Sequence, residues 1–297
     1  MTPTETPTDT PTETPTVTET PTVTETPTIT DTPTVTETPT ITPTPTTTAT
    51  LTPTATATAT PIPLDHFICD KIKVKSSTPF TPNLGVPIVD RFGPLTIDIK
   101  KVASLCNPAN VNSGQPGAQS HTEHGVSYQT RVTRETPKFV KVLNQQVVNS
   151  VFGTVFVDVK RPARLFMASA ESLTSPPPPL VAPHTENFQC YKISKARGAA
   201  SFVDVPGVVV VDQLESFLTV TVKKPAMLCV PANVDGAHPG AENHALHPDV
   251  LLCYKVKRPA GFKFALVTPV YINNELGPLT LDAIKSEHLC VASQIVP

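Results

Sequence analysis

Six cysteines are the residues of this chain whose types and spacing most directly predict chemistry. They fall into three pairs, and the two members of each pair are 37 to 39 residues apart. In a further copy of the same sequence pattern, Ser127 and Phe166 replace both cysteines together. If the two cysteines of each copy form a disulfide, they are expected to be lost together, because losing only one would leave a reactive thiol. The predicted disulfides are Cys69–Cys106, Cys190–Cys229 and Cys253–Cys290; free thiols and metal ligation are the alternatives.

Two histidine pairs could bind a metal ion. They occupy equivalent junctions of the chain and each has a glutamate nearby, Glu123 or Glu242, so each could supply two or three ligands to zinc. On a loop this spacing fixes no geometry, and neither ligand set is complete. We therefore interpret them as polar linker residues and predict no metal site and no cofactor. The pairs are His121/His124 and His244/His247.

Catalytic motifs are not found in the sequence. There is no Gly-x-Ser-x-Gly elbow, no glycine-rich phosphate loop and no His-Glu-x-x-His. Asp98, Asp158 and Asp282 recur on the polar face of one kind of strand, where we expect them to keep an exposed sheet face soluble. We predict that the protein has no catalytic residues and is not an enzyme.

Two other repeated features have a structural and a functional interpretation. The segments 160–163 and 223–226 read Lys-Lys/Arg-Pro-Ala and could form a small docking spot for anions, but a turn that ends a strand is favoured, since proline cannot continue a ladder. Tyr128, Tyr191 and Tyr254 follow the first cysteine position and point to the opposite strand face. They could line a sugar-binding surface, but packing in the core is favoured.

The elements that position these residues are predicted to be β-strands. Apolar residues alternate with polar ones over five or six positions, as in Leu95, Ile97 and Ile99, and glycine or proline bounds each such run. Equivalent runs recur in all four copies, and no stretch keeps a helical period of 3.6 residues. The sequence therefore predicts an all-β fold.

A second level of repetition predicts two domains. The connector between the first two units resembles the connector between the last two, whereas a proline-rich spacer separates the second unit from the third. Each doublet is just over a hundred residues long, enough to bury a core as a β-sandwich or a closed barrel, which a single unit could not do. The predicted boundaries are 64–171 (units 64–111 and 121–171), a linker at 172–183, and 184–297 (units 184–235 and 243–297).

Residues 1–63 are almost entirely threonine and proline, with interspersed acidic residues. Such a segment cannot bury a core, so we expect a disordered stalk, which could carry O-linked glycans. The segment holds seven acidic residues and no lysine or arginine, which leaves 23 basic and 18 acidic residues in the remainder. That excess is spread over four units without a dense basic patch, so we expect no nucleic-acid partner.

The location of the protein is predicted from its cysteines and its stalk. The sequence has no apolar run long enough to span a membrane and no export signal at its start. Disulfides persist mainly in oxidising compartments. We therefore expect an extracellular or cell-surface protein whose export signal lies upstream of residue 1; a cytoplasmic protein with six free thiols is the alternative.

The repeated motifs resemble an uncharacterised bacterial domain that occurs in tandem on secreted, often multidomain proteins, sometimes behind Thr/Pro-rich linkers. Its pattern is approximately His-Phe-x-Cys-Tyr-Lys, then Asp-Gln-Phe-Gly, then Leu-Cys-Val/Asn-Pro. Segments 187–193, 90–93, 105–108 and 228–231 match it. Asp70 stands where tyrosine is usual, and Glu215 where glycine is usual. The resemblance covers 64–297 and implies a secreted protein, but no activity.

Taken together, these observations predict a non-enzymatic, secreted or cell-surface β-repeat protein with a structural or adhesive role. Its partner is unknown; an extracellular protein or a glycan would suit it. The alternative is a carbohydrate-binding or accessory module of an extracellular enzyme system. The chain has no tryptophan and four tyrosines, so it offers few aromatic platforms for sugars. A metal-dependent enzyme would require the two histidine pairs to converge on a carboxylate.

Overall fold

The computed structural model describes residues 63–296, so the predicted disordered stalk lies almost entirely outside the described residues. The described part is antiparallel β-structure with one short 3₁₀ turn at Ala118–Ser120, which confirms the predicted all-β class. The strands are β1 His66–Val74, β2 Asn83–Asp90, β3 Gly93–Val111, β4 Glu123–Val132, β5 Val142–Asn149, β6 Gly153–Ser172, β7 Phe188–Lys195, β8 Val205–Val211, β9 Leu218–Val234, β10 Asp249–Lys257, β11 Val267–Asn273 and β12 Leu279–Val296.

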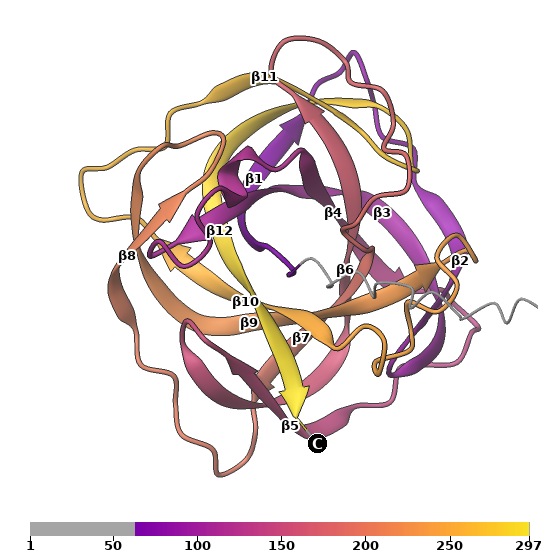
Figure 1. Cartoon of the computed structure of the whole chain (residues 1–297). Coiled ribbons are helices and arrows are strands. Elements are labelled where there is room, and N and C mark those ends of the chain that lie inside the picture. The colour runs from indigo at the N-terminus through magenta and orange to yellow at the C-terminus, as the bar shows by residue number, and fades with distance from the viewer. Residues whose placement is uncertain (1–62, 297) are drawn as a thin grey trace, which may run out of the picture. The chain divides into compact units, whose positions relative to one another are not determined.

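Eight of these strands close into a ring, which Figure 1 shows in a view along its axis. Each predicted unit supplies a first strand and a long last strand to the ring. The hydrogen-bonded order is β1, β3, β4, β6, β7, β9, β10, β12 and back to β1. Closure leaves no free edge in this ring, which is how an all-β protein avoids exposed backbone donors and acceptors.

The other four strands cover the outside of the ring. β2, β5, β8 and β11 each form a hairpin with the long strand of their own unit. Each also pairs with the end of the long strand two units away: β2 with β9, β8 with β3, β5 with β12, and β11 with β6. Two apolar clusters fill the space between the hairpins and the ring. The ring strands are therefore packed on both faces.

The structure differs from the predicted division into two domains. Residues 64–171 and 184–297 lie in one hydrogen-bonded sheet, because β6 pairs with β7 and β12 pairs with β1. The seams between the two doublets have the same antiparallel pairing as the seams within them. A doublet alone would leave two strand edges unpaired, and the second doublet satisfies both.

The centre of the ring is filled by sulfur and aromatic rings. The three disulfides pair as predicted, each between residues directly opposite on neighbouring strands. They form one buried cluster with Phe67, Phe166 and Phe188. The rings of Phe67 and Phe166 are 5.2 Å apart, although β3 and β4 separate their strands in the ring. Such a contact is made across the interior, so this cluster is the inner core.

The unit without cysteines fills the same position by a concerted replacement. Ser127 lies opposite Phe166 where the other units have paired cysteines. Residue 125 is glycine where the first and third units have Phe67 and Phe188. A Cβ atom at Gly125 would lie 2.0 Å from Cζ of Phe166. The glycine therefore makes room for the ring that replaces the disulfide, a signal that the paired loss of cysteine did not reveal.

The three repeated tyrosines belong to the core, as favoured from the sequence. All three are buried, and each hydroxyl reaches the turn of the unit two positions away in the ring. Tyr128 is bonded to Asn274, Tyr191 to Asp90 and Tyr254 to Asn149. These bonds satisfy buried polar groups and join opposite units.

Two of the three repeated aspartates, Asp98 and Asp158, have a different role from the one expected, whereas Asp282 pairs with the side chains of Thr268 and Lys75. Asp98 is buried and accepts hydrogen bonds from the backbone of Gly85 (3.2 Å) and from Oγ1 of Thr133 (2.8 Å). Asp158 accepts one from the backbone of Asn144 (3.0 Å). Gly85 and Asn144 have φ values of 71° and 53° and lie at β-bulges of β2 and β5. These carboxylates therefore fix bulged backbone.

The Lys-Lys/Arg-Pro-Ala segments do not end strands. Segment 160–163 lies inside β6, and segment 223–226 lies inside β9. The register shifts before and after each proline, while Pro162 and Pro225 stand opposite Tyr191 and Tyr254, so each proline lies between bulges of a long strand. A bulge tolerates proline because its ladder is already interrupted.

Ring closure predicts that the doublet 184–297 does not fold as a monomer. Alone, it would expose the edges of β7 and β12 together with the inner core. We expect it to be unfolded or to pair with a second copy that completes the ring, whereas 63–297 should be a folded monomer. Light scattering after gel filtration, with amide NMR dispersion, measures this; a well-dispersed monomer of 184–297 would contradict the closed ring.

The inner core predicts that Gly125→Ala destabilises the protein by about 1–3 kcal/mol, the usual range for overpacking. Combining it with Phe166→Leu should recover part of that loss, because a smaller side chain relieves the clash. Denaturant unfolding of the single and double variants measures both effects. A Gly125→Ala variant as stable as the wild type would show that Phe166 does not pack against this backbone.

Candidate functional site

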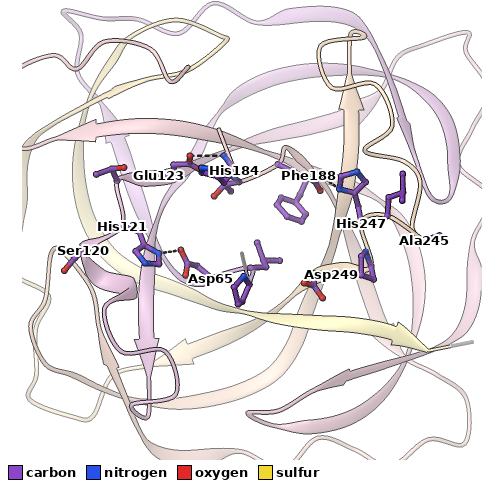
Figure 2. Close-up of a pocket in the computed structure, with 16 residues that line it drawn as sticks. Asp65, Ser120, His121, Glu123, His184, Phe188, Ala245, His247 and Asp249 are labelled. Carbon is purple, nitrogen blue, oxygen red and sulfur yellow. Dashed lines mark hydrogen bonds and ion pairs between the residues drawn. The ribbon is translucent and has the colours of Figure 1, made fainter. Parts of the chain in front are cut away.

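A pocket of about 870 Å³ opens at one end of the ring, and Figure 2 shows the side chains around it. Four of its lining residues are acidic, one from each unit: Asp65, Glu123, Glu186 and Asp249. Each lies four positions before the first cysteine of its unit, or its serine equivalent: Glu123 and Asp249 begin β4 and β10, and Asp65 and Glu186 lie just before β1 and β7. Strand residues an even number apart share a face, so Glu123 and Asp249 lie on the same inner face of the ring as the cysteine positions. All four residues line the pocket at the end of the ring. We call these four residues the acidic collar.

Three histidines line the same pocket. His121, His184 and His247 each lie six positions before the first cysteine position of the second, third and fourth units. The first unit has Pro63 at the equivalent position. The pocket therefore repeats one arrangement of His and carboxylate around the ring, with one histidine missing.

Each histidine loop contacts the acidic residue of the preceding unit. Nδ1 of His121 lies 2.6 Å from a carboxylate oxygen of Asp65, and His247 makes the same kind of pair with Glu186. Glu123 instead accepts the backbone N–H groups of His184 (2.9 Å) and Thr185 (2.6 Å). These contacts hold the carboxylates around the opening, as the dashed lines of Figure 2 indicate.

Asp249 is the remaining member of the collar, and its partner comes from the sheet. It accepts a hydrogen bond from Nε2 of Gln294 (3.0 Å), the residue opposite it on β12. Among residues 63–296 no histidine pairs with Asp249, which corresponds to the missing histidine of the first unit.

The pocket is acidic with an apolar floor. Phe188, which belongs to the inner core, lies at its base, and Leu64 and Leu246 contribute further apolar surface. Burial raises the pKa of Asp65 and of Glu186 above their usual values. A cation in the pocket would favour the charged forms of these carboxyls, so the site is suited to a positively charged group with an apolar body.

The structure separates the members of the predicted histidine pairs. His121 and His247 line the pocket, whereas His124 is buried beside Asn107 and Glu171. His244 lies elsewhere, in a surface hollow. Between residues 63 and 296, no group of three or more His, Cys, Asp or Glu side chains is arranged to hold a metal ion.

Sequence reasoning missed most of the collar. It named Glu123 only as a neighbour of a histidine pair, and it did not select Asp65, His184, Glu186 or Asp249 as site residues. The signal was present, because an acidic residue occurs at the same distance from the cysteine position in all four units.

A second group of acidic side chains is buried between the ring and its hairpins. Asp70 replaces the tyrosine of the other units, and Asp212 is the equivalent of the turn residue that such a tyrosine would contact. Burial raises the pKa of each to about 7, and the carboxyl of Asp70 further raises the pKa of Asp212. Glu171 is also buried, and its pKa is raised to about 8. Arg258, bonded to Glu215 and Ser286, is the cation that faces Asp70.

No protein-family model matches the chain, and no curated protein or solved structure matches it. Among residues 63–296 no helix is long and apolar enough to cross a membrane. The three disulfides are typical of an oxidising environment.

The buried carboxyls predict a pH-dependent stability that Asp70→Asn reduces. The pKa of Asp70 is higher in the folded state than in the unfolded state. The contribution of its protonated carboxyl to the free energy of unfolding is therefore fully present below about pH 4 and is lost as the pH rises towards 7. Between pH 5 and pH 8 the variant should therefore lose about 2 kcal/mol less stability than the wild type. Urea unfolding at both pH values measures this, with the exposed Asp235→Asn as control; identical pH dependence in the wild type and Asp70→Asn would contradict the buried cluster.

Proposed function

We propose that the protein is a non-catalytic extracellular binding protein with a structural or adhesive role, and that its ligand site is the pocket inside the acidic collar. One observation carries this proposal: four carboxylates at equivalent positions surround a single pocket at the end of the ring. Its volume falls within the range of about 300–1,000 Å³ that is usual for ligand sites.

The side chains of the pocket favour a cationic ligand. Glu123 and Asp249 are bonded to neutral donors, so their charge is not offset by a partner. A ligand with amino groups could bind these carboxylates through charge-assisted hydrogen bonds, while its apolar surface contacts the exposed Leu246. An oligomer of an amino sugar has both features, and it suits an extracellular protein better than a free metal ion does.

The histidines of the pocket support binding rather than catalysis. His121 and His247 are each paired with a carboxylate, as a catalytic base would be. Within the described residues, however, no hydroxyl or thiol side chain donates a hydrogen bond to either imidazole, and the six cysteines are all in disulfides. The hydroxyls of Ser120, Thr122 and Thr185, which line the same pocket, are thus not aligned with an imidazole as the nucleophile of acyl transfer would be.

Calorimetric titration with glucosamine oligomers tests this proposal, with N-acetylglucosamine oligomers of equal length as the uncharged comparison. We expect the full chain to bind the cationic oligomer, and Glu123→Gln/Asp249→Asn to bind it at least about tenfold more weakly, since hydrogen bonds to charged groups contribute about 1.5–3 kcal/mol. Affinity should also fall on acidification, because the raised pKa values of Asp65 and Glu186 favour early protonation.

A matched control is Glu135→Gln/Asp235→Asn, which removes two acidic charges outside the pocket and should leave affinity nearly unchanged. Equal binding of the acetylated oligomer would favour the alternative of a general carbohydrate-binding module. Failure to bind either oligomer, or equal losses in both double variants, would contradict a cation site in the collar.

A further inference from the structure

A second pocket, of about 420 Å³, is lined by six basic side chains. Lys192 on β7 and Lys255 on β10 lie two positions after the cysteines of their strands. The acidic collar lies four positions before those cysteines, so the two pockets lie towards opposite ends of the ring strands. The six residues are Lys141, Lys160, Arg161, Lys192, Lys224 and Lys255, and we call them the basic cluster.

The charges of the basic cluster are uncompensated. The pocket contains no acidic residue, and among the ion pairs of residues 63–296 none involves a member of the cluster. Other cations of the ring strands differ in this respect. Arg164 pairs with Glu287 at 2.9 Å, and Arg258 pairs with Glu215. Like charges repel when they are held together, so the cluster is a site where anions would be stabilising.

The backbone concentrates these cations. Consecutive residues of a regular strand point to opposite faces, yet Lys160 and Arg161 line the same pocket. The pairing of β6 with β7 shifts between Val159 and Arg161, so a bulge turns both side chains to one side. A bulge of β9 brings Lys224 to the same place. The repeated Lys-Lys/Arg-Pro-Ala motif therefore builds the pocket that the sequence only suggested.

We propose that the basic cluster binds an anionic polysaccharide, through sulfate or carboxylate groups carried on successive sugars. This site is separate from the acidic collar and does not depend on the proposed function of that pocket. The concave shape and the spread of cations over β6, β7, β9 and β10 suit a flexible chain with repeated charges.

The lining residues distinguish a polysaccharide from other polyanions. The pocket has no aromatic side chain, so it offers no platform on which unpaired bases could stack. Its apolar lining is limited to Ile193, Pro225 and Ala226, without the large buried anchors that protein interfaces use. Charge contacts dominate the site, and an extracellular location, which the disulfides favour, would bring it into contact with charged glycans.

Binding of a fluorescent heparin-derived hexasaccharide to the full chain, measured by anisotropy, tests the proposal. We expect binding that weakens by about tenfold or more between 50 and 200 mM salt, since released counterions make such affinities salt-dependent. Lys192→Gln/Lys224→Gln should bind at least about tenfold more weakly than the wild type. The thermal midpoint and the three disulfides of each variant should be unchanged, because these side chains make no ion pair.

The matched control is Lys71→Gln/Lys101→Gln, which removes two cations at the equivalent positions of the first unit, outside the pocket. We expect this control to weaken binding by no more than about threefold. Equal losses in both double variants would show that net charge alone drives binding and would overturn the site. The assignment of a polysaccharide ligand would be overturned if single-stranded DNA bound as tightly as the hexasaccharide, with the same dependence on Lys192 and Lys224. It would also be overturned if the hexasaccharide did not bind.

The collar variant Glu123→Gln/Asp249→Asn separates this proposal from the preceding one. It should bind the hexasaccharide with unchanged affinity, because its substitutions lie in the other pocket. A loss of hexasaccharide binding in this variant would contradict two independent sites.

Discussion

Closing eight strands into a ring leaves an interior that side chains must fill, and the rest of the structure depends on how this protein fills it. Three disulfides and one phenylalanine occupy equivalent positions around the inner core. Each disulfide joins neighbouring strands of one unit and also supplies apolar volume. Where the cysteines are lost, Phe166 provides the volume and Gly125 provides the space. The core can thus keep its packing without the covalent bond.

The same geometry accounts for the two pockets. The inner core occupies only the middle of the ring strands, so the residues that line the two pockets beyond it are half-buried or exposed. Because the four units place equivalent strands around the ring, a residue type that recurs at one fixed spacing from the core occurs up to four times at the same end of the ring. An acidic residue before the core becomes a collar at one end, and a lysine after it contributes to a basic cluster at the other. Opposite charge at the two ends therefore follows from the repeat, and the bulges at Lys160 and Lys224 strengthen it.

Local features of this fold could be predicted from the sequence, whereas its closure could not. The cysteine pairing followed from joint replacement at Ser127 and Phe166, and the strands followed from alternation. The number of domains depends on whether the strands of one doublet pair with those of the other, which the sequence does not show. In the structure β6 pairs with β7 in the same antiparallel way as strands inside a doublet. The proline-rich spacer suggested a boundary, but a long connection does not prevent pairing. Within the site, Asp65 and Glu186 have ordinary surface character in the sequence, and only the ring brings them together.

Amide hydrogen exchange at the two seams between doublets tests the closed ring most directly. Backbone N–H groups that join β1 to β12 and β6 to β7 should be as strongly protected as those that join β3 to β4 and β9 to β10, because all four seams open only when the ring unfolds. Rapid exchange at the β1–β12 and β6–β7 seams, with slow exchange at the other two, would instead show two separately folded doublets and would contradict a ring closed across both seams.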